Sequence, residues 1–173
     1  MSLALLIGDR QSGKTSTCRR LAASARARGL TVGGIIAPAI YEKESCAGYD
    51  VVDLATNRST GLAAIDAAGV EHVGCFGFLV DGLALGKAAL QHAAEIPHDL
   101  VIVDEIGPLE LSGGGWCAQL DPLTRHDGLT LFTVRRSLAT EVAQRWNVPP
   151  GHCNDLADGA DTIIERLIQA IET

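Results

Sequence analysis

The sequence predicts an α/β protein in which a mostly parallel central sheet is flanked by helices on both faces, giving three layers. Short aliphatic runs alternate with helical patterns along the chain, as strands and crossover helices do in a parallel sheet. A glycine-rich turn separates the first aliphatic run from the first helical pattern. Aromatic residues make up only 4% of the chain, and abundant small aliphatic residues suit a sheet that is covered on both faces.

The size and charge of the chain limit its organisation and its partners. A length of 173 residues is that of one ordinary domain, so residues 1–173 are expected to form a single unit. The formal net charge is −7. Because nucleic acids and anionic membranes attract basic surfaces, we expect neither as a partner. A protein partner is left open.

The cysteines and the apolar runs indicate where the protein resides. The five cysteines form no CxxC pair, which disfavours a disulfide framework or a zinc site and favours a reducing compartment. His152 and Cys153 have no second ligand pair nearby, so core packing is expected for them rather than a metal. No run reaches the roughly 18 apolar residues of a membrane span, and no signal peptide opens the chain. A cytoplasmic location is therefore expected.

The turn after the first aliphatic run has the composition of a phosphate-binding loop, or P-loop. Its residues are Gly8, Asp9, Arg10, Gln11, Ser12, Gly13, Lys14, Thr15 and Ser16. Gly8 and Gly13 permit the close approach that lets backbone N–H groups surround the phosphates of a nucleoside triphosphate. Lys14 is predicted to bind the β- and γ-phosphates, and the Thr15 hydroxyl to ligate a Mg²⁺ ion that bridges them.

The remaining elements follow from periodicity and from residues that start or stop them. Strands are expected at residues 3–7, 31–37, 48–54, 100–103 and 129–134, with weaker ones within 73–78 and 152–156. Helices are expected at residues 14–28, 81–95, 116–125 and 137–146 and at the end of the chain. Gly29 ends the first helix and Pro97 follows the second. Ser137 is predicted to cap the fourth, and Thr162 with Glu165 to form the capping box of the last.

Some stretches carry only turn signals. Residues 39–47 are polar and precede the alternating residues 48–54, so the two stretches suggest a hairpin at the sheet edge. Residues 57–61 are expected to be a loop and residues 107–111 a turn. The glycine-rich residues 112–115 are a candidate binding loop.

Two acidic residues follow the most hydrophobic strand. Four consecutive aliphatic residues, 100–103, lead directly into Asp104 and Glu105. The carboxyl ends of parallel strands form the edge at which ligands bind, so both side chains are expected beside the P-loop. Asp104 is the predicted partner of Mg²⁺ opposite Thr15, and Glu105 the base that activates an attacking water. Acidic residues that merely end a strand in solvent are the alternative, which the P-loop upstream makes weaker.

Arginine and tryptophan residues supply further candidates. Arg135 and Arg136 follow the strand at 129–134, and one of them is predicted to stabilise charge on the γ-phosphate, with Arg135 preferred. Arg10 is an alternative within the loop, and a solvated turn is the alternative role for the pair. Trp116 and Trp146 are candidates for stacking a base, although tryptophans on helices more often serve packing.

With these motifs placed, the chain resembles a known family. The P-loop, the string Asp-Glu-Ile-Gly-Pro-Leu-Glu-Leu at 104–111, the Gly48-Tyr49-Asp50 strand, the Val73-Gly74-x-Phe76 segment and the Thr133-Val134-Arg135 strand end occur in the family's order. The family is that of small nucleoside-triphosphatases typified by the thermophile enzyme and the cancer-related nucleoside-triphosphatase.

The resemblance implies a P-loop NTPase fold of the additional-strand, catalytic-glutamate class, with a core sheet of five or slightly more strands and a β-hairpin insertion. It also implies Mg²⁺-dependent hydrolysis of ATP, GTP and other nucleoside triphosphates to the diphosphate and phosphate, with loose base choice. Lys14, Thr15, Asp104 and Glu105 match the family pattern. The family usually has arginines before the Gly-aromatic-Asp strand, whereas this chain has residues 42–47, Glu-Lys-Glu-Ser-Cys-Ala.

Two other functions are compatible with the same motifs. A small-molecule P-loop kinase would replace the attacking water with an acceptor hydroxyl. An accessory protein for cofactor assembly, of the molybdopterin-guanine-dinucleotide type, also combines a P-loop with a Gly-x-x-Val-Gly strand, here residues 29–33. Such a protein would turn over slowly without its partner.

Overall fold

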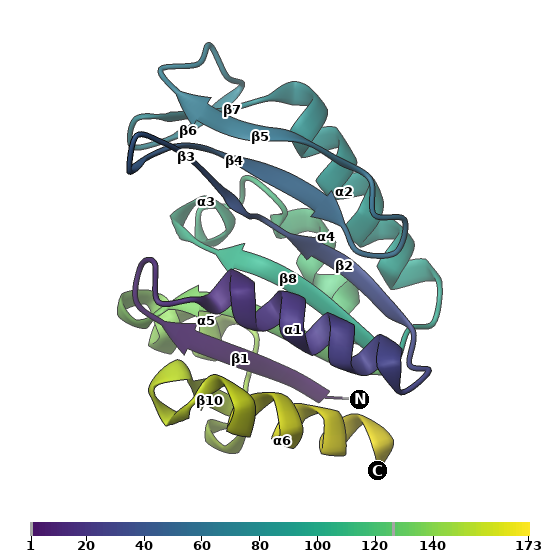
Figure 1. Ribbon diagram of the computed structural model, residues 1–173. Helices are drawn as coiled ribbons and strands as arrows, with labels where there is room; N and C mark the ends of the chain where they lie inside the picture. Colours follow the sequence, from purple (N-terminus) through teal and green to yellow (C-terminus); the bar gives the residue numbers. More distant parts are fainter. Residues whose placement is uncertain (1, 126) are drawn as a thin grey trace.

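The computed structural model describes residues 2–125 and 127–173, and its strands form one mixed sheet (Figure 1). The strands are β1 (Ser2–Gly8), β2 (Val32–Ile36), β3 (Ala39–Glu42), β4 (Ser45–Asp53), β5 (Ser59–Ile65), β6 (Glu71–Val73), β7 (Phe76–Phe78), β8 (Leu100–Ile106), β9 (Leu129–Arg135) and β10 (Cys153–Asp155). The helices are α1 (Lys14–Ala27), α2 (Val80–Glu95), α3 (Pro108–Leu111), α4 (Cys117–Leu123), α5 (Ala139–Arg145) and α6 (Ala160–Glu172). Short 3₁₀ turns are η1 (Arg136–Leu138), η2 (Pro150–His152) and η3 (Leu156–Asp158).

The first half of the sheet is parallel, as the aliphatic runs predict. Its strands lie in the order β10-β1-β9-β8-β2. β9 therefore lies between β1, which leads into the P-loop, and β8, which carries Asp104 and Glu105. This order brings the carboxyl ends of β1, β8 and β9 to one edge.

The second half of the sheet is antiparallel, so the expectation of a mostly parallel sheet was wrong for these strands. β2 pairs with β4, and the order continues β4-β5-β7-β6, with β3 on β4. Residues 59–61, expected as loop, open β5, because β4 pairs with them along one side. Residues 39–42, expected as turn, form the first arm of the β3–β4 hairpin. The segment at 73–78 contributes to two short strands instead of one.

Helices cover both faces of the sheet, and two hydrophobic clusters fill the layers between. One cluster packs α1 and α6 against the sheet through residues such as Leu21 and Ile168. The other packs α2, α4 and α5 on the opposite face, for example Leu90 and Leu120. Figure 1 shows α1 in front of the parallel strands and α4 and α5 behind them. In β8 alternate residues point to the two clusters, which explains why the strand is aliphatic throughout.

Two predicted helix starts were wrong. The last helix begins at Ala160 after Gly159, so Thr162 already lies in the first turn and does not cap it. Ser137 lies within η1, and α5 begins only at Ala139, because the chain makes a 3₁₀ turn before it can pack its helix. Gly29 has the left-handed φ of 79° expected after a helix. Residues 108–111, predicted as a turn, form one helical turn.

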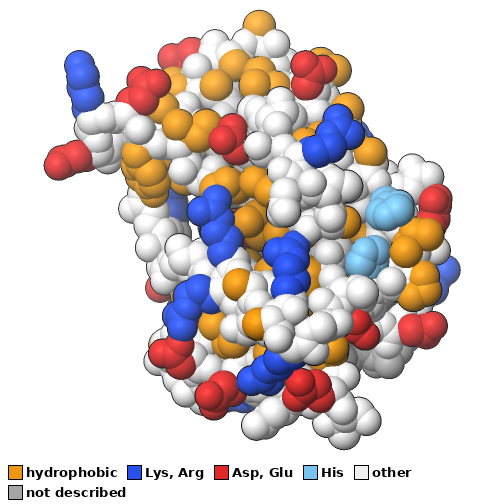
Figure 2. All heavy atoms as spheres, turned by 45° about the vertical axis from the view of Figure 1, so that its right-hand side comes forward, with side chains coloured by type: hydrophobic (Ala, Val, Ile, Leu, Met, Phe, Trp, Pro, Cys, Tyr) orange, Lys and Arg blue, Asp and Glu red, His pale blue; other side chains and the backbone are white. Residues whose placement is uncertain are grey.

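The charged surface, the helices and the cysteines give three further facts. Figure 2 shows side chains of both charges spread over the face it draws. Among residues 2–125 and 127–173, no helix has the length and apolar character needed to cross a bilayer. The five cysteines are unpaired.

Candidate functional site

The P-loop has the backbone geometry that its glycines predict. Gly13 has a φ of 96°, in the left-handed region, and α1 begins at the next residue. A Cβ atom on Gly8 would lie 2.5 Å from Ser12 Oγ, so the turn closes too tightly there for a side chain. The first N–H groups of α1 and the positive end of its dipole therefore face the space above the loop.

Lys14 lies across this loop. Its side chain is buried, and Nζ donates hydrogen bonds to the carbonyl oxygens of Gly8 at 3.0 Å and Asp9 at 2.8 Å. Both acceptors belong to the P-loop itself. The ammonium is thereby held next to the turn that would surround a phosphate.

The carboxylate of Asp104 is buried beside the loop, with the residue only 1% exposed. It accepts hydrogen bonds from Thr15 Oγ1 at 2.7 Å, from the Ala37 N–H at 3.1 Å and from Thr133 Oγ1 at 2.7 Å. Burial raises the pKa of Asp104, and the three hydrogen bonds oppose that rise. Asp104 and Thr15, predicted as joint metal ligands, are thus brought together from β8 and α1.

Glu105 stands at an irregularity of β8. The pairing of β8 with β9 shifts register between Val103 and Ile106, and Glu105 has a left-handed φ of 69°. Its N–H donates to Thr133 Oγ1 at 2.8 Å. A bulge of this kind turns a side chain out of the strand's alternation, so Glu105 and Asp104 serve different surroundings although they are adjacent in sequence.

The predicted arginine candidates have three different surroundings. Arg135 Nε donates to Glu105 Oε1 at 2.8 Å, and its Nη2 lies 2.7 Å from the same oxygen. Arg136 pairs with Asp155 and so is engaged away from Glu105. Arg10 lines the cavity beside the loop. Among the three, Arg135 is the arginine that contacts a predicted catalytic side chain.

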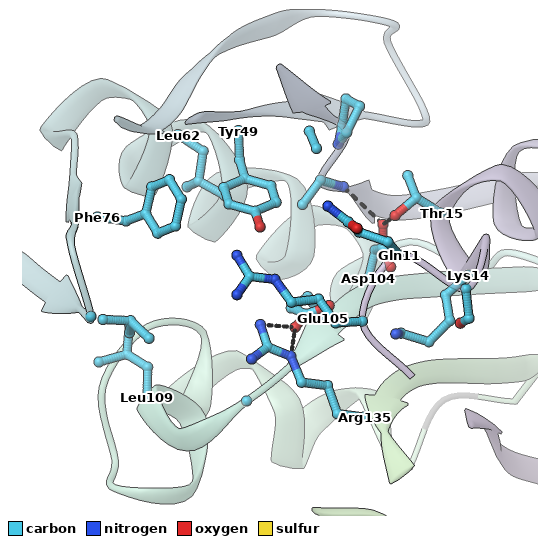
Figure 3. A pocket seen from close by; sticks show the side chains of 18 of the residues that line it. Gln11, Lys14, Thr15, Tyr49, Leu62, Phe76, Asp104, Glu105, Leu109 and Arg135 are labelled. Atoms are coloured by element: carbon cyan, nitrogen blue, oxygen red, sulfur yellow. Dashed lines mark hydrogen bonds and ion pairs between the residues drawn. The ribbon is translucent and has the colours of Figure 1, made fainter. Parts of the chain in front are cut away.

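A cavity of about 540 Å³ extends from the P-loop across the end of β8 to the antiparallel strands. Loop residues, Asp104, Glu105 and Arg135 line its polar part. Its apolar wall, defined as Tyr49, Leu62, Phe76, Phe78 and Leu109, comes from β4, β5, β7 and α3. In Figure 3, Thr15 and Asp104 lie to the right of Glu105, whereas Tyr49, Leu62 and Phe76 lie to its upper left and Arg135 lies below it.

Sequence reasoning missed several residues of this site. Thr133 was noted only as part of a strand end, and nothing in its type predicts that its hydroxyl joins Asp104 to Glu105. For the apolar wall, the available signal was the Gly48-Tyr49-Asp50 and Val73-Gly74-x-Phe76 segments. They were noted as part of the resemblance, and no functional role was predicted for them.

Glu110 is another residue whose role the sequence did not predict. It is buried, and its carboxylate accepts from the Gly107 N–H at 2.9 Å and the Trp116 N–H at 3.4 Å. Burial raises its pKa to about 7. The side chain ties the end of β8 to the start of α4. The one signal for it was its place in the string at 104–111.

The remaining candidates contribute to packing, and Trp116 also lines the cavity. Trp116 and Trp146 are 3% and 8% exposed. Trp146 packs edge-on against Phe132 with ring centroids 5.7 Å apart, and Trp116 contributes to the same hydrophobic cluster. His152 Nδ1 lies 3.0 Å from the Leu3 carbonyl oxygen, which joins η2 to β1.

Known proteins resemble the chain over most of its length. The family model described as NTPase matches residues 4–152. The nucleoside-triphosphatase THEP1 of Methanothermobacter thermautotrophicus is 31% identical over 145 residues, covering 83% of this chain and 82% of the relative. The THEP1 protein of Methanopyrus kandleri is 36% identical over 112 residues, covering 65% and 61%.

Two solved structures share the fold. The crystal structure of THEP1 from the hyperthermophile Aquifex aeolicus has a TM-score of 0.76 at 16% identity and covers 99% of each chain. The solution structure of a human cancer-related nucleoside triphosphatase has a TM-score of 0.75 at 17% identity and covers 99% of this chain and 97% of its own. Since the family model spans most of the sequence and these folds extend along nearly all of it, the chain belongs to the NTPase family.

Proposed function

We propose that this protein hydrolyses nucleoside 5′-triphosphates, ATP and GTP among them, to the diphosphate and phosphate with the help of Mg²⁺ and with loose base choice. The observation that carries the proposal is a continuous series of hydrogen bonds beside the P-loop. It runs from Thr15 to Asp104 at 2.7 Å, from Thr133 to Asp104 at 2.7 Å, and from the Glu105 N–H to Thr133 at 2.8 Å. The series supports the proposal that Thr15 and Asp104 bind the metal and that Glu105 is the base, all beside one phosphate site.

The donor atoms present suit Mg²⁺. Thr15 Oγ1 and Asp104 Oδ2 are hard oxygen donors 2.7 Å apart, and a Mg²⁺ ion carried by phosphates needs only one or two protein ligands. Ala37 and Thr133 fix the orientation of the carboxylate. When bound there, Mg²⁺ neutralises negative charge that develops on the β- and γ-phosphates.

The chain's own residues would bind the phosphates and accept the proton of the attacking water. The N–H groups of residues 8–16 bind the phosphates, and Lys14 binds the β- and γ-phosphates as a point charge. Glu105 accepts the proton of the attacking water. The position of β9 between β1 and β8 supports the additional-strand, catalytic-glutamate class. The β3–β4 hairpin supports the proposed insertion. We further propose that residues 1–173 act as one unit.

Arg135 is proposed to stabilise charge on the γ-phosphate. The Glu105 carboxylate is 37% exposed and the Arg135 side chain 35%, so both reach the cavity while they contact each other. A guanidinium that neighbours the base and the phosphate site can donate to the transferred group as its negative charge grows.

A phosphate-release assay tests these roles. With ATP or GTP and Mg²⁺, the wild type is expected to release phosphate, and Glu105→Gln to lower kcat by about 10²- to 10⁴-fold while nucleotide binding persists. Lys14→Ala is expected to weaken binding as well, and Arg135→Ala to lower kcat by about 10³-fold. Glu165→Gln, an exposed site on α6, is the matched control for the loss of a carboxylate. Normal hydrolysis by Glu105→Gln would exclude Glu105 as the base.

A further inference from the structure

Three residues of the apolar wall, Tyr49, Leu62 and Phe76, lie on the other side of Glu105 from Lys14 and Thr15 (Figure 3). Asp104 lies on the same side of Glu105 as Lys14 and Thr15. The polar and apolar parts belong to one continuous cavity. This arrangement separates the site proposed for the triphosphate from a second space of different chemistry.

The geometry of phosphoryl transfer indicates which reacting group would occupy that second space. The attacking oxygen and the leaving oxygen lie roughly in line on opposite sides of the γ-phosphorus. The leaving oxygen belongs to the β-phosphate, so the nucleoside lies on the leaving side. Glu105, as the base, must lie on the attacking side. The apolar wall, three residues of which lie beyond Glu105, is therefore on the side of the attacking group.

The lining of the far end of the cavity differs from that of a site for water alone. A bound water is held by polar partners, whereas the far end of this cavity is lined by aromatic and aliphatic side chains; the whole cavity, with the space beside the P-loop, has a volume of about 540 Å³. Tyr49 and Phe76 pack edge-on with centroids 5.3 Å apart, and together they present ring surfaces to the cavity. Such surfaces bind planar apolar groups.

Polar groups lie beside the ring surfaces. Arg10 lines the same cavity, and its guanidinium is close enough to Tyr49 to oppose the rise that burial causes in the pKa of that phenol. Glu105 supplies an acceptor at the inner end. A ligand here would thus find ring contacts along one wall and hydrogen-bonding groups toward the phosphates.

We propose that the apolar wall is an acceptor site, at which the protein transfers the γ-phosphoryl group to the hydroxyl of a small aromatic or heteroaromatic alcohol. The proposal rests on the proposed function for the position of the triphosphate. The acceptor oxygen forms a bond to the γ-phosphorus while the bond from that phosphorus to the β–γ bridging oxygen breaks. The hydroxyl proton goes to Glu105, and the products are the phosphate monoester and the nucleoside diphosphate. Hydrolysis is the same step with water in place of the alcohol.

Transfer of radiolabel tests the acceptor site directly. The full-length protein is incubated with Mg²⁺ and γ-³²P-labelled ATP in the presence of benzyl alcohol, pyridoxine or adenosine, and the products are separated by thin-layer chromatography. Label is expected on at least one alcohol as a phosphate monoester, in competition with free phosphate. Phosphate release without label on any of the three would overturn the acceptor site and leave the proposed hydrolysis standing. Failure of both phosphate release and transfer would contradict the proposed function as well.

Variants of the wall distinguish a wall that binds the acceptor from a wall that binds the nucleobase of ATP. Phe76→Ala is expected to lower the ratio of transfer to hydrolysis by about tenfold or more, because a ring contact is lost, and to leave the Kd for ATP within about twofold. Phe76→Leu, which keeps an apolar side chain, covers the case in which the alanine variant does not fold. Ile96→Ala, an exposed apolar site at the end of α2, is the control and should not change the ratio. An ATP affinity weakened tenfold in both Phe76 variants would show that the wall binds the adenine ring of ATP and would overturn the proposal.

Discussion

Thr133 lies between the two acidic residues of the site. Its hydroxyl donates to Asp104 Oδ1 at 2.7 Å and accepts from the Glu105 N–H at 2.8 Å. One side chain on β9 thus fixes the carboxylate that is proposed to bind Mg²⁺ and the backbone of the candidate base. Displacement of either acid would require this hydroxyl to give up a buried hydrogen bond.

Substitution of Thr133 is expected to affect stability and catalysis together. Thr133→Val keeps the shape of the side chain but removes the hydroxyl, so the buried carboxylate and the Glu105 N–H each lose a partner. We expect a loss of about 1–3 kcal/mol in the free energy of unfolding, measured by urea denaturation, and a lower kcat for phosphate release. Thr133→Ser retains the hydroxyl and should recover most of both. A valine variant as active and stable as the wild type would contradict this role.

Glu110 should make stability depend on pH. Burial raises its pKa from 4.5 to about 7, so between these values the folded protein holds a proton that the unfolded chain has released. Its contribution is complete below pH 4.5 and is lost as pH rises to about 7, a total of about 3 kcal/mol. Urea denaturation across this range should show the fall in the wild type and its absence in Glu110→Gln.

The matched control is Glu95→Gln, at an exposed site on α2, which should retain the fall. Parallel pH profiles for the wild type and Glu110→Gln would contradict the assignment to Glu110. Only the difference between the profiles bears on this residue, because other groups titrate in the same range.

Sequence reasoning identified the catalytic candidates but not what supports them. Lys14, Thr15, Asp104 and Glu105 come together as predicted, because a P-loop and the end of a buried parallel strand share one sheet edge. Thr133 and Glu110 could not be assigned roles in the same way. Their roles depend on the register between strands and on how one helical turn packs, and neither is a local property of the sequence.

At the scale of elements, β2 approaches β8 very closely at one glycine. Gly34 has a φ of 92°, and a Cβ atom there would lie 2.0 Å from the Ile102 carbonyl oxygen. Gly34→Ala is therefore expected to reduce the free energy of unfolding by about 3 kcal/mol or more, by backbone strain and a steric clash. Gly151→Ala, where a Cβ meets nothing within 4 Å, should change it by less than about 0.5 kcal/mol. Urea denaturation of both variants checks the contrast.

The antiparallel strands are the part of the fold that local sequence patterns predict least well. Among the parallel strands, β2, β8 and β9 are almost fully buried, and β8 and β9 are apolar runs that a single sequence reveals. β5 begins with Ser59, Thr60 and Gly61, which read locally as a loop. These three residues are part of a strand because they pair with β4, and that pairing is a tertiary effect. The same reason explains why the apolar wall escaped prediction.

For the whole molecule, nucleotide binding is expected to raise the melting temperature. A ligand at one hundred times its Kd stabilises the folded state by about 2.7 kcal/mol, or roughly 5–10 °C for a chain of this length. Scanning fluorimetry with ATP and Mg²⁺ should show the full shift. ATP with a chelator should show less, and Lys14→Ala should show little. Equal shifts with and without the chelator would contradict the proposed metal ligands.

The change of strand direction at β2 has a consequence for how this protein can vary. β2 pairs in parallel with β8 on one side and antiparallel with β4 on the other, so the proposed phosphate site lies on one side of this strand, and the wall residues of β4, β5 and β7 lie on the other. Substitutions in β4, β5 and β7 can reshape the wall without changing α1, which carries Thr15, or β8, which carries Asp104 and Glu105. Two proteins of this architecture can therefore share one chemistry at the phosphate while they differ in the molecule that meets it.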